Sequence, residues 1–217
     1  EPISVKYPSR DARNTVLYVP EESVDVYRNA SGWKDFIVIA ESNGNTDWTE
    51  GQIVVNVESA GGLRMALLER DEEEIRRLKI CGPLNSIDLQ YLAEGKGVIS
   101  NLESIDLSEV TLIYDGGCYR SYTYEDPDVM WSYNKYSFFL TEETSEEHGS
   151  SPMSGTTYHH YYGPDLAGLF MYGPYKHIVM PRGITRAASH AFSECANLQE
   201  VEFANGLKYV ASSAFAG

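Results

Sequence analysis

The chain repeats itself with a period of 23 residues near its C-terminus. The segment from Ile184 to Phe192 returns as the segment from Leu207 to Phe215, and the two agree at Ala188/Ala211, Ser189/Ser212, Ala191/Ala214 and Phe192/Phe215. A second pattern, with apolar residues at i, i+3 and i+5, starts at Tyr175 and again 23 residues later at Leu198. A unit this short cannot bury its apolar face alone, so the units must stack into a solenoid in which each covers the next.

The same apolar pattern fits two earlier segments, which start at Ile75 and at Leu102. Apolar residues two positions apart predict a short strand with both side chains on one face. The residues that alternate with them are expected to project outward from neighbouring strands in two rows. The first row contains Arg77, Ser104, His177 and Glu200, and the second contains Lys79, Asp106, Val179 and Glu202. These rows change from basic to acidic along the array; they form either a binding surface or a plain solvated sheet face.

A long insertion is expected within the array. Leu107 and Met180 occupy the same template position but lie 73 residues apart, which predicts roughly 50 inserted residues. The interval between them holds 11 of the 16 tyrosines. Tyr and Trp offer a large contact area with a polar tip at little entropic cost, so the insertion is a second candidate surface. Its candidate ligand-binding residues are Tyr119, Tyr122, Tyr124, Trp131, Tyr133 and Tyr136; the alternative is that these rings fill the gap between repeats.

The C-terminal units resemble the BspA-type bacterial leucine-rich repeat, whose units carry the signature Ala-Phe-x-x-Cys-x-x-Leu. In this chain Ala191, Phe192, Cys195 and Leu198 match that signature. The strong resemblance covers about residues 175 to 217, and weaker ones cover 14 to 40 and 63 to 110. The resemblance implies a repeat array that continues past Gly217, because the pattern expects a further cysteine there.

The expected fold is an α/β leucine-rich-repeat solenoid with short parallel strands, a helical N-terminal capping segment and a Tyr-rich insertion. An apolar stripe of Leu63, Leu67 and Leu68 predicts a helix over residues 63–77, and a second helix is expected over residues 87–94. The predicted parts are a repeat-like or array-closing segment (1–48), the helical cap with the first repeats (49–110), the Tyr-rich insertion (111–174) and the BspA-type repeats (175–217). Within the insertion, the acidic, Ser/Gly-rich residues 141–155 are expected to form a mobile loop.

Spacings typical of catalytic or metal sites are absent from the sequence. The three cysteines, Cys81, Cys118 and Cys195, lack the Cys-x-x-Cys spacing of zinc and redox sites. His159 and His160 are adjacent on an expected extended segment, so their side chains point to opposite faces. The sequence contains no phosphate-binding loop, dinucleotide fingerprint or Gly-x-Ser-x-Gly motif. We therefore expect no enzymatic activity, no metal and no cofactor.

The net charge and the short apolar runs limit the kinds of partner that the chain can bind. Thirty-two acidic residues against 17 basic ones give a formal charge of −15, which disfavours nucleic acid. The longest apolar run, Phe36 to Ala40, is far shorter than the roughly 20 residues of a membrane-spanning helix, and no signal peptide opens the chain. The resemblance implies a secreted or cell-surface protein that adheres to a host or neighbouring-cell protein. A carbohydrate-binding or carbohydrate-active module that uses the aromatic insertion is the alternative, and a structural spacer is the third hypothesis.

Overall fold

The computed structural model describes residues 16–18, 24–29, 38–40, 48–68, 70, 74–94, 100–125, 133–151, 155–204, 206–211 and 213–217. The helices in these ranges are α1 (Val24–Asn29), α2 (Leu63–Leu67) and α3 (Ser86–Ala93). The strands are β1 (Val16–Tyr18), β2 (Val38–Ala40), β3 (Ile53–Asn56), β4 (Arg77–Leu84), β5 (Ser104–Leu112), β6 (Cys118–Glu125), β7 (Tyr133–Leu140), β8 (Ser145–Ser151), β9 (Thr156–Gly163), β10 (His177–Val179), β11 (Arg186–Ala187), β12 (Glu200–Glu202) and β13 (Tyr209–Val210). Most of residues 1–47, and Trp131, lie outside the described residues.

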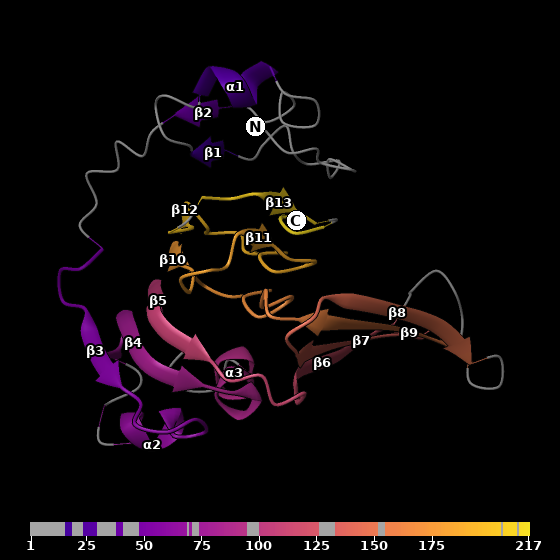
Figure 1. Cartoon of the computed structure of the whole chain (residues 1–217), viewed down its shortest axis with the longest axis horizontal. Helices are drawn as coiled ribbons and strands as arrows, with labels where there is room; N and C mark the ends of the chain where they lie inside the picture. The colour runs from indigo at the N-terminus through magenta and orange to yellow at the C-terminus, as the bar shows by residue number, and fades with distance from the viewer. Residues whose placement is uncertain are drawn as a thin grey trace.

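The central element is a five-stranded parallel sheet with the strand order β12-β10-β5-β4-β3 (Figure 1). β5 and β10 are direct neighbours, with Ile105 opposite Ile178, although a long stretch of chain separates them. Ile178 in turn lies opposite Val201, 23 residues further along. The predicted period, the predicted alignment of units and the parallel solenoid are therefore confirmed.

The apolar pattern of these strands builds one side of the core. Because successive side chains of a strand point to opposite faces, every second residue faces inward. Six of these inward side chains are fully buried: Leu78, Ile80, Ile105, Leu107, Ile178 and Met180. Burying a Leu, Ile or Met side chain contributes roughly 1.5–3 kcal/mol each, so this row of contacts is the main force that holds the units together.

β3 adds one further strand to the sheet, and this strand was not predicted from the sequence. Ile53 pairs with Leu78 and Val55 with Ile80, so β3 continues the ladder beyond β4. Val55 is buried, whereas Val54, which points outward, is 49% exposed. The period-two pattern of Ile53 and Val55 was the available signal, but it lacks the third apolar residue of the repeat template.

The return segments of the C-terminal units are held by a stack of phenylalanines. The ring of Phe192 lies between those of Phe170 and Phe215, with centroid distances of 5.6 Å and 5.0 Å. β11 and β13 pair in parallel, with Arg186 opposite Tyr209. The recurring Ala-Phe pair therefore contributes one ring per unit to the core, and the predicted equivalence of these phenylalanines is confirmed.

α3 begins with a capping box. The Asn85 side chain accepts hydrogen bonds from the backbone N–H groups of Ile87 (3.1 Å) and Asp88 (3.4 Å). The buried Asp88 carboxylate also accepts from the N–H groups of Gly61 (2.6 Å) and Leu63 (2.9 Å). Because these donors lie at the start of α2, Asp88 fixes the two helices to each other.

The helix predicted over residues 63–77 is too long. α2 ends at Leu67, and β4 already begins at Arg77. Leu63 and Leu67 are buried as predicted, but Leu68, the third residue of the predicted stripe, is 63% exposed. The alternating apolar residues at the start of β4 fit between β3 and β5, and this strand pairing outweighs the local helical pattern.

The Tyr-rich chain between β5 and β10 forms a four-stranded sheet with the order β6-β7-β9-β8, which projects to one side in Figure 1. The prediction of a mobile loop over residues 141–155 is wrong, because β8 lies within it and pairs antiparallel with β9. Charged residues such as Glu146 and Glu147 are common on edge strands, where charge prevents pairing with another chain. The polar composition of this segment thus reflects an edge strand.

The N-terminal part contains a pair of strands that does not belong to the five-stranded sheet. β1 and β2 are parallel, with Val16 opposite Val38, and α1 lies between them in the sequence. The side chains of these strands lie outside the described residues. The division of the chain into four parts, including the repeat-like segment 1–48, stays a prediction.

Candidate binding face of the parallel sheet

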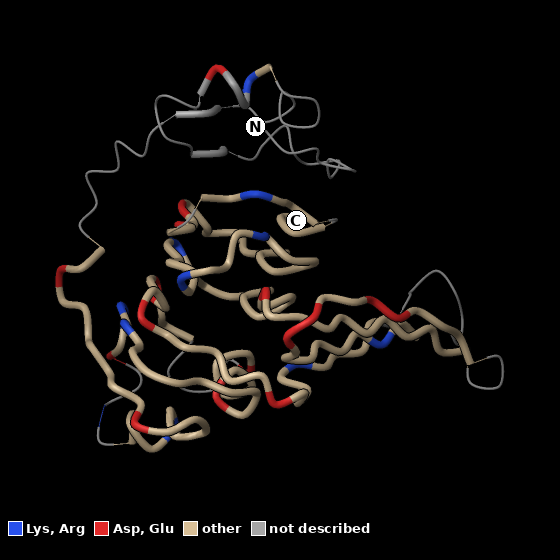
Figure 2. The backbone as a smooth tube through the Cα atoms, in the orientation of Figure 1, with Lys and Arg blue, Asp and Glu red and all other residues tan. Residues whose placement is uncertain are grey.

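The two predicted outward rows lie side by side on the five-stranded sheet. In the first row, Ser104 pairs with Arg77 on one side and with His177 on the other, and His177 pairs with Glu200. The second row is aligned in the same register and contains Lys79, Asp106, Val179 and Glu202. Figure 2 shows basic residues on the inner strand β4 and acidic residues on the edge strand β12. The register and the direction of the charge change are as predicted.

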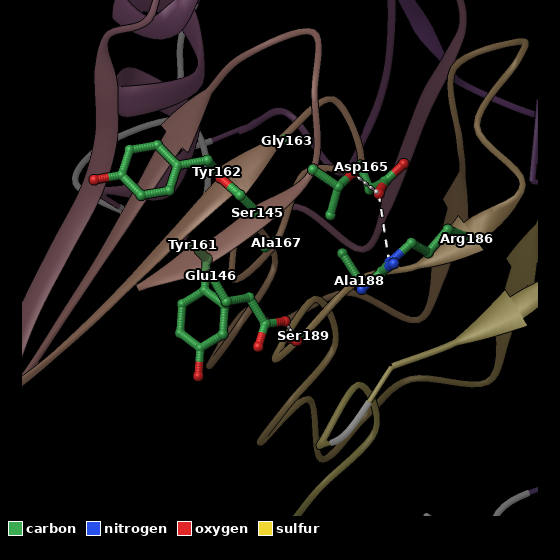
Figure 3. A pocket seen from close by; sticks show the side chains of 11 residues that line it. Ser145, Glu146, Tyr161, Tyr162, Gly163, Asp165, Ala167, Arg186, Ala188 and Ser189 are labelled. Atoms are coloured by element: carbon green, nitrogen blue, oxygen red, sulfur yellow. Dashed lines mark hydrogen bonds and ion pairs between the residues drawn. The ribbon is translucent and has the colours of Figure 1, made fainter. Parts of the chain in front are cut away.

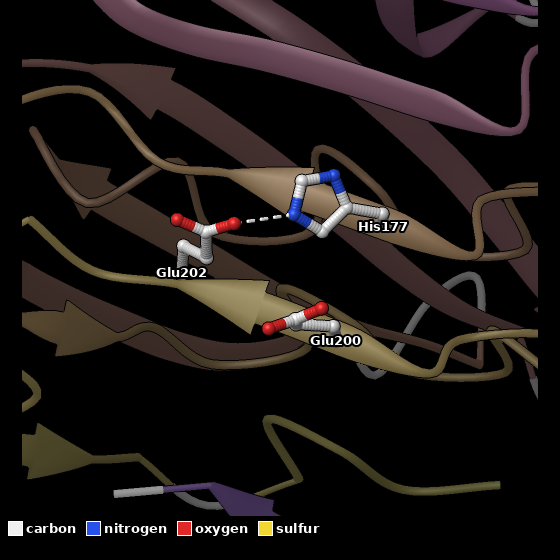
Figure 4. A group of neighbouring side chains, drawn as sticks. All are labelled: His177, Glu200 and Glu202. Atoms are coloured by element: carbon white, nitrogen blue, oxygen red, sulfur yellow. Dashed lines mark hydrogen bonds and ion pairs between the residues drawn. The ribbon is translucent and has the colours of Figure 1, made fainter. Parts of the chain in front are cut away.

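His177 lies at the centre of this face. Its side chain is only 5% exposed, and its Nδ1 lies 3.0 Å from Oγ of Ser104 on β5. Its Nε2 lies 2.6 Å from Oε1 of Glu202 on β12. Figure 4 shows the imidazole directed at Glu202, with Glu200 on the same strand. Both ring nitrogens therefore have polar partners on neighbouring strands.

Trp48 covers His177 from the solvent side of the sheet. The two rings are stacked, with centroids 5.1 Å apart and planes 4° apart. The indole Nε1–H donates to Oε2 of Glu200 at 3.4 Å, and the Arg77 guanidinium lies 5.8 Å from the indole centroid. Trp48, which precedes β3 in the chain, therefore contacts side chains of β4, β10 and β12. No sequence pattern points to Trp48, because it precedes the first strand of the parallel sheet and belongs to no repeat.

The second row contains a small ion-pair network. Nζ of Lys79 lies 3.1 Å from Oε1 of Glu109 and 3.4 Å from Oδ2 of Asp106. The hydrogen bond to Glu109 is the main reason why the pKa of Lys79 is raised. Because these groups are partly exposed, the pairs contribute little to stability. Their effect is to hold a fixed pattern of charge on the face.

The contact between Ser104 and His177 has the distance of a nucleophile and its general base, with Glu202 as the third group. Ser104, however, is fully buried, with 0% of its surface exposed. A substrate carbonyl cannot reach its Oγ without opening the sheet. The three side chains therefore order the face and do not form a hydrolytic site.

The candidate residues of the Tyr-rich sheet are placed differently. Tyr119, predicted to bind a ligand, is 1% exposed, and its hydroxyl donates to the backbone carbonyl of Ala167 at 2.7 Å. This prediction is corrected: Tyr119 belongs to the core, where its ring packs near Phe138. Burial raises the pKa of Tyr119 well above its usual value, as expected for a phenol without access to water.

Tyr122 and Tyr136 form a stacked ladder with His159 across β6, β7 and β9. The centroid distances are 4.8 Å between the two tyrosines and 4.7 Å between Tyr136 and His159. Both faces of Tyr136 are therefore covered by neighbouring rings. Tyr124 is 50% exposed, and Tyr133 is partly buried at the start of β7. A flat platform for a sugar ring needs exposed ring faces, and Tyr136 offers none.

A small hollow marks the junction between the Tyr-rich sheet and the repeats (Figure 3). In it, Arg186 of β11 points at Asp165, with Nε 3.5 Å from Oδ2, and the Ser189 hydroxyl donates to Glu146 at 3.1 Å. Burial raises the pKa of Asp165. The hollow has a volume of about 10 Å³, which is room for about one water molecule. It is therefore a structural junction and not a ligand site.

Residues 167–217 match the family model described as the BspA type leucine-rich repeat region (6 copies). The resemblance seen in the sequence is thereby confirmed for the C-terminal units, which form a repeat module of a kind that generally binds proteins. No curated protein matches the chain. In the parts of the chain that the structure describes, no helix has the length and apolar character needed to cross a bilayer.

Proposed function

We propose that this chain is a non-enzymatic binding module of a leucine-rich-repeat protein, and that it binds another protein through the outward face of its parallel sheet. The supporting observation is the register of that face, in which the exposed Val54 lies opposite Lys79, and Lys79 lies opposite Asp106. Side chains fixed at regular spacing on a rigid sheet lose little entropy on binding, which favours recognition over a large area.

The composition of the face suits a protein partner. Trp48 and Arg77 are of the residue types that dominate binding energy at protein interfaces. Val54 adds an exposed apolar side chain next to Lys79, with which it pairs in register. Because the charge changes from basic on β4 to acidic on β12, the matching surface is acidic at one end and basic at the other.

The setting of the module is part of the proposal. The resemblance to BspA-type repeats supports a secreted or cell-surface protein that adheres to a host or neighbouring-cell protein. The complete burial of Ser104 supports a role without catalysis. A glycan partner is the second candidate, supported by the exposed rings of Tyr124 (50%) and Tyr172 (61%), and weakened by the covered faces of Tyr136.

The proposal is tested by surface plasmon resonance of the whole chain over purified extracellular-matrix proteins and glycans, at low and physiological salt. Two face variants, Val54→Glu and Lys79→Glu, are compared with the control Tyr124→Ala. Each variant is first checked for a wild-type unfolding midpoint. We expect binding to a protein that is weakened at least about tenfold by each face variant and left unchanged by the control.

Two results would count against this assignment. Loss of protein binding only in Tyr124→Ala would move the surface to the Tyr-rich sheet. Binding to glycans alone, again lost only in Tyr124→Ala, would favour the carbohydrate-binding alternative.

A further inference from the structure

Three potential metal ligands converge on the outward face. The imidazole of His177 and the carboxylates of Glu200 and Glu202 each offer one ligand atom, and these atoms all lie within 4.8 Å of one another. Glu200 and Glu202 are two residues apart on β12, so both side chains lie on the same face. His177 pairs directly with Glu200 on the neighbouring strand. The backbone of the sheet therefore fixes the positions of all three groups (Figure 4).

Two further side chains orient these ligands. Ser104 lies 3.0 Å from Nδ1 of His177, and the Trp48 indole donates to Glu200. Metal-binding histidines nearly always use their second ring nitrogen in a hydrogen bond of this kind, which fixes the ring and its tautomer. A serine hydroxyl suits the role because it can donate to Nδ1 or accept from it.

We propose that His177, Glu200 and Glu202 bind a divalent first-row transition metal ion, for which Zn²⁺ is the appropriate probe. One imidazole nitrogen and two carboxylate oxygens are ligands that such ions accept, whereas Ca²⁺ requires six to eight oxygens. Three protein ligands leave a fourth tetrahedral position for water. Glu202 is 53% exposed, so an ion reaches the site from solvent.

Binding of the ion moves one proton within the imidazole of His177. Without metal, Nε2 of His177 faces a carboxylate, which only accepts, so the fitting neutral tautomer has its proton on Nε2 and accepts from the Ser104 hydroxyl at Nδ1. When the ion binds Nε2, the single proton of the neutral ring moves from Nε2 to Nδ1 by exchange with solvent, and the Ser104 hydroxyl turns to accept it, so that no net proton is released. No local spacing in the sequence predicts this site, because its ligands come from two adjacent repeats.

The test is isothermal titration of the whole chain with Zn²⁺ alone, so it does not depend on the proposed protein partner. We expect one ion per chain. Glu202→Gln and Glu200→Gln remove one ligand each and are expected to weaken binding at least about tenfold, and Ser104→Ala about tenfold. The control is His148→Gln, because exposed His148 faces His159 in the other sheet, with their Nδ1 atoms 2.9 Å apart.

Co²⁺ absorption identifies the ligands independently. Visible d–d bands that disappear in Glu202→Gln, without a thiolate charge-transfer band from Cys81, Cys118 or Cys195, would support the site. No Zn²⁺ binding by the folded wild-type chain would overturn the proposal. So would wild-type affinity in both glutamate variants, or loss of binding only in His148→Gln.

Discussion

The indole of Trp48 lies flat on the imidazole of His177, with the ring centroids 5.1 Å apart. Trp48 precedes β3 at one edge of the parallel sheet, whereas His177 lies on β10, with β4 and β5 between these strands. The contact therefore ties the first described turn of the solenoid to the C-terminal units.

Replacing Trp48 by Ala is expected to lower the free energy of unfolding by about 2 kcal/mol, because both the stacking on His177 and the buried area of the indole are lost. Urea denaturation followed by far-ultraviolet circular dichroism measures the change. Tyr172→Ala serves as a control, since this ring is 61% exposed, and should change stability by less than about 0.5 kcal/mol. Equal stabilities of the Trp48 variant and the wild type would show that the stacking does not exist in solution.

Asp88→Ala is expected to cost about 3 kcal/mol. The Asp88 carboxylate is 1% exposed and accepts backbone hydrogen bonds from Gly61, Leu63 and Asn85, and these buried donors would lose their acceptor. Asp88→Asn keeps one acceptor oxygen and should lose less. The same denaturation experiment applies, with the exposed Glu94→Gln as reference. If Asp88→Ala matched that reference, the proposed link between α2 and α3 would be wrong.

The chain should become less stable as the pH falls from about 7.5 to about 5.5. Burial, together with the nearby His159, lowers the pKa of His190, and Glu146 opposes this shift; burial, His148 and His160 lower the pKa of His159. The folded chain therefore binds fewer protons than the unfolded chain below the ordinary histidine pKa of about 6.5. Stability is fully present above that pH and is lost as the pH falls toward the lowered values.

Thermal denaturation at these two pH values tests the expectation. His190→Asn should show a smaller fall in Tm than the wild type, because it removes one of the two histidines. Asn is chosen because residue 190 has φ 57°, a left-handed conformation that Asn tolerates. A Tm that rises on acidification would contradict the assigned direction of both pKa shifts.

Cys118 should react with a thiol reagent faster than Cys195. Burial raises the pKa of Cys195 to about 11, and its Sγ donates to the backbone carbonyl of Phe170 at 3.0 Å. Cys118 is exposed. At pH 8, iodoacetamide should alkylate Cys118 at least about tenfold faster than Cys195, since the thiolate is the reactive form. Peptide mass spectrometry measures the alkylation of each cysteine. In urea, which unfolds the chain, the two alkylation rates should become similar. Similar rates in the native chain would place Cys195 outside the core.

The parallel ladder could be predicted from the sequence because a solenoid converts sequence period into register. A spacing of 23 residues placed Ile178 opposite Val201 and Phe192 against Phe215, without any knowledge of the long segment between β5 and β10. The two rows of outward side chains were predicted in the same way, because equivalent residues of successive units lie opposite each other. The sequence repeat was therefore sufficient to predict the pairing wherever one unit contacts the next.

Features that depend on contacts outside the repeat could not be predicted. β8 is polar and Gly-containing, and only its pairing with β9 shows that it is an edge strand. Tyr119 has the same local pattern as the more exposed Tyr124, and its burial depends on Phe138 and Ala167. The position of Trp48 on His177 likewise has no local signal, because stacking depends on the fold of the whole sheet.

Site-specific photo-cross-linking tests the binding face most directly. A photoreactive amino acid is introduced at Val54, which is 49% exposed and belongs to the outward face, and separately at Tyr172, which is 61% exposed and lies near Tyr122 and Tyr136 of the Tyr-rich sheet. Each folded chain is irradiated with the protein identified in the binding panel. We expect a cross-link from position 54 and none from position 172. A cross-link from position 172 alone would show that the partner binds at the Tyr-rich sheet and would contradict binding through the outward face of the parallel sheet.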